Sequence, residues 1–153
     1  MKLKRVIYTI LLIIWMLVIF LFSNQTASKS QSASDKVASD IVDVVEVVTK
    51  NDIKESKKES IIENTRFIVR KTAHFTLYFI LGIIVYLLLT SYNVKMPILY
   101  SILFCLLYAC SDEIHQLFSS GRTAKVMDVC IDTFGSSVAI IIFSTITKLL
   151  KHK

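Results

Sequence analysis

Four long apolar stretches constrain this chain more than any other feature of its sequence. They are Val6–Phe22, Thr72–Leu89, Met96–Ala109 and Val129–Thr147. A helix of about 20 residues crosses the ~30 Å of hydrocarbon in a bilayer, and only helices or closed barrels satisfy their backbone polar groups there. We therefore expect an all-α integral membrane protein, one domain over residues 1–153, with transmembrane helices at about 6–22, 70–89, 96–116 and 127–147.

The composition excludes a soluble domain. Apolar residues make up 54% of the chain and charged residues 20%, and the mean hydropathy is +0.59. A net charge of +6 often indicates nucleic acid as a partner. Here, however, basic residues flank the apolar stretches, where they orient the protein and contact anionic lipid headgroups. We predict the lipid bilayer as a partner and no nucleic acid.

The charges divide unequally between the two sides of the membrane. Alternate threading of the stretches leaves one side, which holds both termini, with basic residues and no acid: Lys2, Lys4, Arg5, Lys95, Lys148, Lys151 and Lys153. All 12 Asp and Glu residues fall on the other side. Short loops and tails rich in Lys and Arg stay in the cytoplasm. We therefore predict a multi-pass plasma-membrane protein with both termini cytoplasmic and an extracytoplasmic active face.

The first stretch resembles a signal peptide only in its charged start. Val6–Phe22 is 17 residues long, which exceeds the usual hydrophobic region of a signal peptide. Phe22-Ser23-Asn24-Gln25 also lacks a small-residue cleavage motif. We predict that this stretch is retained as a membrane anchor.

The external loop, at about residues 23–66, has two parts. Residues 23–34 are rich in Ser, Gln and Lys and predict a solvated linker. The apolar residues Val37, Ile41, Val44, Val45 and Val48 then recur at helical spacing and favour an amphipathic helix over a strand. That helix would lie on the outer membrane surface or form a lid on the bundle. Residues 52–55 resemble a capping box, from which a charged helix would run to the second span.

The three cysteines Cys105, Cys110 and Cys130 fall within the third and fourth spans. Their number is odd and their spacing is not that of a zinc site. We expect three reduced thiols that act as small apolar packing groups. The alternative is a disulfide between Cys110 and Cys130.

Ionisable residues fall at the same depth on three of the predicted helices. They are His74, about one turn inside the outer boundary of the second span, then Asp112, Glu113 and His115 in the third span, and Asp128 and Asp132 in the fourth. An isolated charge within a membrane costs about 2–3 kcal/mol even on lenient scales. We therefore expect these groups to face one another around an outward-opening polar pocket. Lys71, His74, Tyr78 and Gly82 share one helical stripe towards that pocket.

Three ordered motifs carry a resemblance to a known family. They are Arg70-Lys71-Thr72-Ala73-His74-Phe75, the run from Asp112-Glu113-Ile114-His115-Gln116 to Gly121-Arg122, and Asp128-Val129-Cys130-Ile131-Asp132-Thr133-Phe134-Gly135. With Phe22-Ser23-Asn24-Gln25 they make the chain resemble the VanZ-like family. It departs from the family pattern at Ser120, where Pro is usual, and at Leu77, where Glu is frequent.

The resemblance implies a four-span membrane protein whose family namesake is an accessory determinant of resistance to the glycopeptide teicoplanin. It implies no reaction, because the family's biochemical activity is not established. The site residues that the resemblance carries over are Lys71, His74, Asp112, Glu113, Gln116, Arg122, Asp128 and Asp132.

Our leading hypothesis is an outward-facing site that binds or processes an anionic, lipid-linked cell-wall molecule or a peptide terminus, with a link to glycopeptide susceptibility. The candidate catalytic residues are His74, Glu113 and Asp128; the candidate ligand-binding residues are Lys71, Asp112, Gln116, Arg122 and Asp132. Lys71 and Arg122 would hold phosphate or carboxylate. His74, with Glu113 or Asp128, would perform general acid–base chemistry.

Two other classes of function stay open. A membrane hydrolase or transferase would use a carboxylate–histidine pair or a metal held by His74, Glu113, His115 and Asp128, but no metal-binding motif such as H-E-x-x-H is present. We expect no metal and no cofactor, and whether the protein is an enzyme stays undecided. In the other class, a structural or partner-binding protein, the charges would form a packing network without chemistry. A solute carrier is disfavoured, because four spans lack paired broken helices. The sequence does not constrain the oligomeric state.

Overall fold

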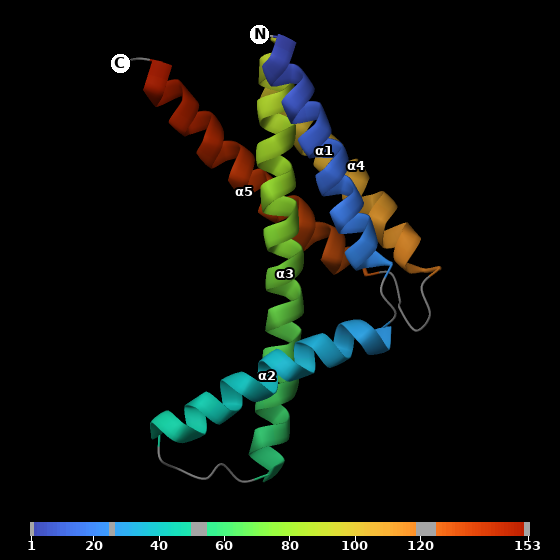
Figure 1. The fold of residues 1–153 in the computed structure, drawn as a ribbon, viewed down its shortest axis with the longest axis vertical. Helices are drawn as coiled ribbons and strands as arrows, with labels where there is room; N and C mark the ends of the chain where they lie inside the picture. Colours follow the sequence, from blue (N-terminus) through green and yellow to red (C-terminus); the bar gives the residue numbers. More distant parts are fainter. Residues whose placement is uncertain (1, 25–26, 50–54, 119–124, 152–153) are drawn as a thin grey trace.

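The computed structural model describes residues 2–24, 27–49, 55–118 and 125–151, and within these ranges the chain forms five helices and no strand. The helices are α1 (Lys2–Ser23), α2 (Ala27–Thr49), α3 (Glu55–Ser91), α4 (Pro97–Gln116) and α5 (Val126–Lys151). Figure 1 shows α1, α3, α4 and α5 gathered in a bundle, and α2 lying across α3 beyond one end of it.

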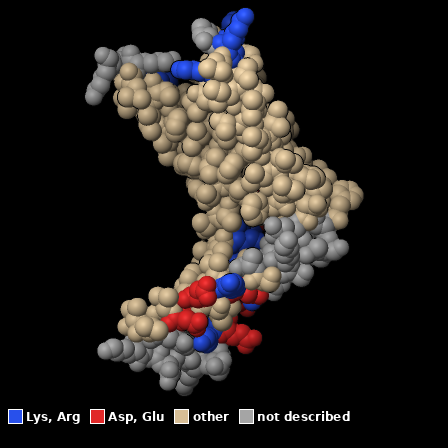
Figure 2. Space-filling model, in the orientation of Figure 1, with Lys and Arg blue, Asp and Glu red and all other residues tan. Residues whose placement is uncertain are grey.

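Four of these helices (α1, α3, α4 and α5) are long and apolar enough to cross a membrane. This confirms the four spans that the sequence predicts. The start of α1 and the end of α5 lie at the same end of the bundle (Figure 1), as an even number of crossings requires. In Figure 2 an uncharged band separates basic residues at that end from mixed charges around α2.

Helix α3 is the centre of the fold and contacts each of the other four helices. Its 37 residues span about 55 Å at 1.5 Å per residue, which exceeds the thickness of the hydrocarbon. The predicted span at 70–89 is therefore only part of this helix. The charged helix predicted before that span is the first part of α3. Residues 52–54 of the predicted capping box (52–55) lie outside the described residues.

The crossing of α3 and α5 depends on two glycines that allow the two backbones to touch. A Cβ atom at Gly82 would lie 2.6 Å from the backbone oxygen of Ser136, and one at Gly135 would lie 2.7 Å from that of Phe75. No real Cβ approaches backbone so closely, so only glycine fits at either position. Small residues that allow close approach are typical of membrane helix interfaces. The two contacts fix how α3 and α5 face each other.

Helix α1 is attached to the bundle by hydrogen bonds between side chains and backbone carbonyls, one with α3 and one with α4. The indole nitrogen of Trp15 donates to the carbonyl of Leu77 at 2.9 Å. The hydroxyl of Tyr108, on α4, donates to the carbonyl of Met16 at 2.8 Å. Buried Tyr and Trp side chains combine a large apolar contact with one satisfied polar group. These bonds set the rotation of α1 against α3 and α4.

The connection between α3 and α4 is tight. Asn93 has a φ of 57°, and the amide of Val94 donates back to the carbonyl of Leu89 at 3.2 Å. Asparagine tolerates this left-handed conformation at a helix C-terminus. Pro97 lies in the first turn of α4, where its missing N–H costs nothing.

Helix α2 confirms the amphipathic helix and corrects the predicted linker. The linker was expected at residues 23–34, but α2 begins at Ala27. Ala38 and Val42 are buried against α3, and Asp35 forms an ion pair with Arg66. Tertiary packing thus offsets the weak helical preference of the serines. Among the described helices α2 contacts α3 alone.

The three cysteines are free, and the alternative disulfide between Cys110 and Cys130 is not formed. Cys105 is buried, Cys110 is half-buried and Cys130 is exposed. Only Cys105 therefore behaves fully as the small packing group that we expected.

Candidate functional site

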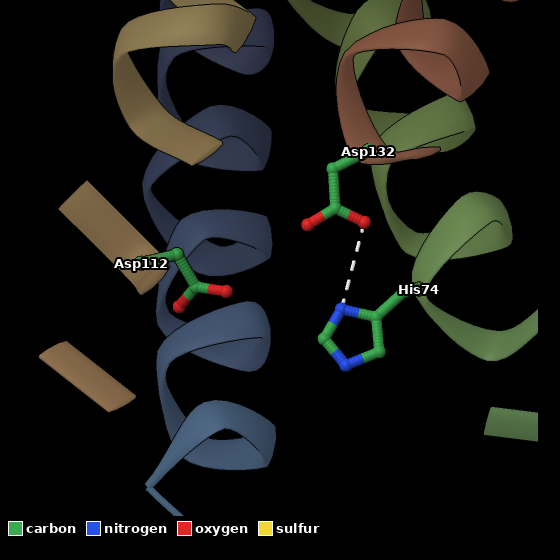
Figure 3. Close-up of side chains that lie close together, drawn as sticks. All are labelled: His74, Asp112 and Asp132. Atoms are coloured by element: carbon green, nitrogen blue, oxygen red, sulfur yellow. Dashed lines mark ion pairs between the residues drawn. The ribbon is translucent and has the colours of Figure 1, made fainter. Parts of the chain in front are cut away.

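Three helices bring a histidine and two aspartates together near the end of the bundle that lies opposite the termini. His74 comes from α3, Asp112 from α4 and Asp132 from α5, and one side-chain ligand atom of each lies within 4.8 Å of the other two. We call these three residues the His74 cluster. In Figure 3 the Asp112 carboxylate and the His74 imidazole point towards the space below Asp132.

Within the cluster, His74 is paired with Asp132. Their Nδ1 and Oδ1 atoms lie 3.5 Å apart, which is longer than a normal hydrogen bond. The Asp132 side chain is 2% exposed and that of His74 is 18% exposed. Asp132 Oδ1 accepts no hydrogen bond from the described residues. The pair is therefore close but loosely bonded, and the imidazole is partly exposed.

The Asp112 carboxylate is also buried and accepts a hydrogen bond from its own helix. Gln116, one turn later on α4, donates from Nε2 to Asp112 Oδ2 at 3.3 Å. Ser23, at the end of α1, lies near this carboxylate, although its hydroxyl makes no hydrogen bond within the described part of the chain. The end of α1 thus forms a further side of the cluster.

Tyr78 adds a buried hydroxyl beneath the cluster. It lies one turn from His74 on α3, and its side chain is fully buried. Its hydroxyl is close enough to interact electrostatically with Asp112 and Asp132, yet it has no hydrogen-bond partner among the described residues. Sequence analysis placed Tyr78 on the polar stripe but gave it no role; its position one turn below His74 was the available signal.

A second pair lies one turn further out. Lys71 Nζ forms an ion pair with Asp128 Oδ1, so α3 and α5 meet through two successive pairs, Lys71–Asp128 and His74–Asp132. Both side chains of the outer pair are 17% exposed. Lys71 therefore has a carboxylate partner within the protein and would have to leave it to bind a separate anion.

Glu113 holds the start of α5 and does not contact His74. Its Oε1 accepts a hydrogen bond from the backbone N–H of Lys125, just before α5. The neighbouring His115 stacks on Phe20 with ring centroids 4.5 Å apart. Successive residues on a helix point about 100° apart, so Asp112 enters the cluster, whereas Glu113 lies beside it, close enough to interact electrostatically with Asp132 and Lys71.

The structure thus places the predicted residues in three groups. Four lie in or beside the His74 cluster: His74, Asp112, Gln116 and Asp132. Lys71, Asp128 and Glu113 lie around it in contacts of their own. Arg122 lies outside the described residues, as does Ser120 of the same loop. Sequence analysis overlooked Ser23 as a neighbour of Asp112, although it lies in the Phe22–Gln25 motif.

The arrangement has the composition of a proton-transfer site or a metal site. An imidazole oriented by a carboxylate is a common general base. One imidazole nitrogen and two carboxylate oxygens are also donors that bind divalent metals. The ligand set that we considered from sequence was His74, Glu113, His115 and Asp128; of these only His74 belongs to the group that the structure assembles.

A family model described as VanZ/LLP1 matches residues 8–148, which include all of the predicted site residues. No curated protein and no solved structure matched the chain.

Proposed function

The chain belongs to the VanZ/LLP1 family, and from this premise we propose that its His74 cluster faces the outside of the cell and binds or processes an anionic cell-envelope molecule. In this proposal the protein is a multi-pass protein of the plasma membrane. The ligand is a lipid-linked cell-wall molecule or a peptide terminus, reached from the outer leaflet.

The burial of the cluster is the observation that carries this proposal. Asp112 and Asp132 are 5% and 2% exposed, and both lie within a membrane-spanning helix next to an imidazole. Each isolated charge at such a depth costs on the order of 2–3 kcal/mol, and a well-packed apolar core would be at least as stable. A chain that keeps these groups together despite their cost is best explained by a function for them.

The distribution of charge supports the outward orientation. The bundle end that holds the termini carries Lys2, Lys4, Arg5, Lys95 and Lys148 and no acid. Such residues remain in the cytoplasm. The cluster lies towards the other end, so it faces the cell envelope.

His74 is the residue for which we propose direct chemistry. Asp132 pairs with Nδ1 at one edge of the imidazole, and a ligand that approaches from outside the cell would meet the exposed part of the ring. Asp132 would stabilise the imidazolium when His74 accepts a proton. Asp112 and Gln116 would orient the polar part of the ligand, and Lys71 would contact its anionic group after partial release from Asp128.

Glycopeptide susceptibility is the phenotype by which we propose to test this function. Cells that express the protein should show altered teicoplanin susceptibility, and His74→Ala and Asp132→Asn should each abolish the change. Membrane abundance of each variant is measured in parallel by immunoblot. His115→Ala is the matched control, because this second histidine stacks on Phe20 outside the cluster.

Full retention of the phenotype by both cluster variants at normal abundance would remove the proposed function. Loss of the phenotype in His115→Ala at normal abundance would also contradict it. In that case the relevant histidine would be on the α1–α4 side.

The second candidate is a structural role in which the charges specify packing. It is favoured by the contacts of Lys71, Asp128 and Glu113, all of which have partners within the chain. A packing network tolerates replacement by apolar groups of similar volume. Under this candidate the double variant His74→Phe with Asp132→Leu would keep both its membrane abundance and the teicoplanin phenotype. Under the proposed function the double variant loses the phenotype even if its abundance stays normal.

A further inference from the structure

We propose that the His74 cluster is a binding site for a divalent transition-metal ion, Zn²⁺ or Mn²⁺. The ligands are one ring nitrogen of His74, one carboxylate oxygen of Asp112 and one of Asp132. The ion would be the group that allows an acidic cluster to hold an anionic ligand. This last step rests on the proposed function, whereas metal binding itself does not.

The geometry is close to that of a coordination sphere. The three ligand atoms lie within 4.8 Å of one another. Zn–N and Zn–O bonds are about 2.0–2.2 Å long and the usual geometry is tetrahedral, so two ligand atoms of one ion lie about 3.4 Å apart. Rotations of the two aspartate side chains that shorten the separations by up to about 1.4 Å would bring all three atoms to bonding distance. Because the residues come from α3, α4 and α5, one ion would join three helices.

Two buried polar atoms lack hydrogen-bond partners among the described residues, and this points to a ligand independently of the spacing of the three side chains. Asp132 is 2% exposed, and its Oδ1 faces the cluster without accepting a hydrogen bond from the described residues. The fully buried Tyr78 hydroxyl lies near both carboxylates and is likewise without a hydrogen-bond partner there. Buried polar groups are nearly always satisfied. An ion that binds the carboxylates, with a bound water that accepts from Tyr78, would satisfy both.

Charge balance supports the same assignment. Two carboxylates close together in a region of low dielectric repel each other and lack solvent. Lys71, a cation one turn away from His74 on α3, is already paired with Asp128. A divalent ion with two carboxylates and a neutral imidazole has no net charge, and such an assembly is far less costly to bury than two free carboxylates.

The donor set also limits the kind of ion. Imidazole suits Zn²⁺ and carboxylates suit Mn²⁺, so a mixed set accepts either, whereas Cu⁺ and iron–sulfur clusters require thiolates. Three protein ligands leave at least one coordination position open, as in catalytic rather than structural zinc sites. That open position is where a phosphate or carboxylate oxygen of an envelope molecule would bind.

Metal content of the purified full-length protein tests the proposal. The protein in detergent is exposed to Zn²⁺ or Mn²⁺ and desalted, and the metal is then measured by plasma mass spectrometry. We expect about one equivalent of at least one metal per chain in the wild type, and a loss of at least tenfold in His74→Ala and Asp132→Asn. The matched controls His115→Ala, a histidine outside the cluster, and Asp40→Asn, an exposed aspartate of α2, should keep the full equivalent.

Metal loss in a cluster variant could also result from misfolding, so a second measurement uses a protein whose cluster is intact. With Mn²⁺ bound to His115→Ala, spin-echo modulation from a directly coordinated imidazole nitrogen should be present. Less than a tenth of an equivalent of both metals in the wild type would overturn the proposal. So would a full equivalent in His74→Ala and Asp132→Asn, because the ion would then be elsewhere. If no metal binds but the cluster variants still lose the teicoplanin phenotype, the proposed function survives without the ion.

Discussion

The two ends of the helical bundle differ in the sign and the burial of their charged side chains. Near the end with the His74 cluster, carboxylates are buried between helices and paired across them. At the end with the termini, the charges are basic and exposed. Lys95 and Lys148 line an apolar cavity of about 550 Å³ between α3, α4 and α5, and Arg5 donates to the carbonyl of Ser91 at 3.0 Å.

This difference separates two uses of charge in a membrane protein. Exposed basic residues at a helix end orient the chain and contact lipid, with little dependence on fine geometry. Buried opposite charges depend on the relative position of three helices, because each must meet a partner. Mutations should therefore act on fold and function at the cluster end, and on lipid contacts at the other end.

The largest expected effect comes from separating α3 and α5. Gly135→Val would force side-chain atoms into the backbone of Phe75, next to His74. Overpacking of this kind costs about 1–3 kcal/mol or more, and we expect a clear loss of thermal stability together with loss of the cluster's function. Thermal unfolding of the purified protein measures the first effect. Cys130→Val, at an exposed position of the same helix, should remain near wild type, and equal loss in both variants would refute the role of the crossing.

The second expected effect is a coupling energy between Lys71 and Asp128. Both side chains are mostly buried, so removing one partner leaves a poorly solvated charge. A double-mutant cycle with Lys71→Met and Asp128→Leu should give a coupling of about 1–3 kcal/mol. The comparison pair Lys58–Asp43, with a 3.7 Å separation and a 65% exposed aspartate, should give about 0–1 kcal/mol. Equal couplings would mean that burial does not distinguish the two pairs.

A smaller effect is expected at the other end of the bundle. Lys95→Gln and Lys148→Gln should each weaken binding of anionic lipid to the apolar cavity by about 1 kcal/mol, or roughly fivefold. Native mass spectrometry with phosphatidylglycerol, and with phosphatidylcholine as the zwitterionic reference, measures this. Lys36→Gln, an exposed lysine of α2, is the control. An unchanged preference for phosphatidylglycerol in the double variant would show that these lysines do not select lipid.

The smallest expected effect concerns the hydrogen bonds that attach α1, a helix that reaches both ends of the bundle. Trp15→Phe and Tyr108→Phe each remove one hydrogen bond to a backbone carbonyl. Such bonds contribute about 0.6 kcal/mol on average within membranes. Unfolding in mixed micelles should show two small, nearly additive losses. A loss of several kcal/mol from either variant would indicate that α1 is held by that bond rather than by its apolar face.

Much of the fold could be predicted because hydrophobic length alone determines it. The four spans, the α3–α4 turn with Pro97 and the amphipathic helix α2 all follow from local patterns that the structure reproduces. The boundaries were less accessible. The charged helix before the second span was predicted, but local patterns did not show that it continues into that span as one helix of 37 residues.

The depth of the site in the membrane could be predicted from the sequence, but which carboxylate pairs with His74 could not. Counting residues along each span places His74, Asp112 and Asp132 at similar depth, whichever way the helices are rotated about their axes. Which carboxylate meets His74 depends on that rotation, and the contacts of Gly82 and Gly135 with the opposite backbones fix it. Sequence analysis therefore expected Glu113 or Asp128 beside His74, where the structure has Asp132. The catalytic and binding roles themselves stay predictions.

Accessibility of residue 74 from outside intact cells tests the central claim most directly. His74→Cys is made in a chain whose three native cysteines are replaced by alanine, and is treated with a membrane-impermeant maleimide. Lys148→Cys, at the opposite end, is the matched control. We predict that Cys at position 74 is labelled in intact cells and that Cys at position 148 is labelled only after the membrane is opened; the reverse pattern, or no labelling of position 74 in either condition, would contradict the account.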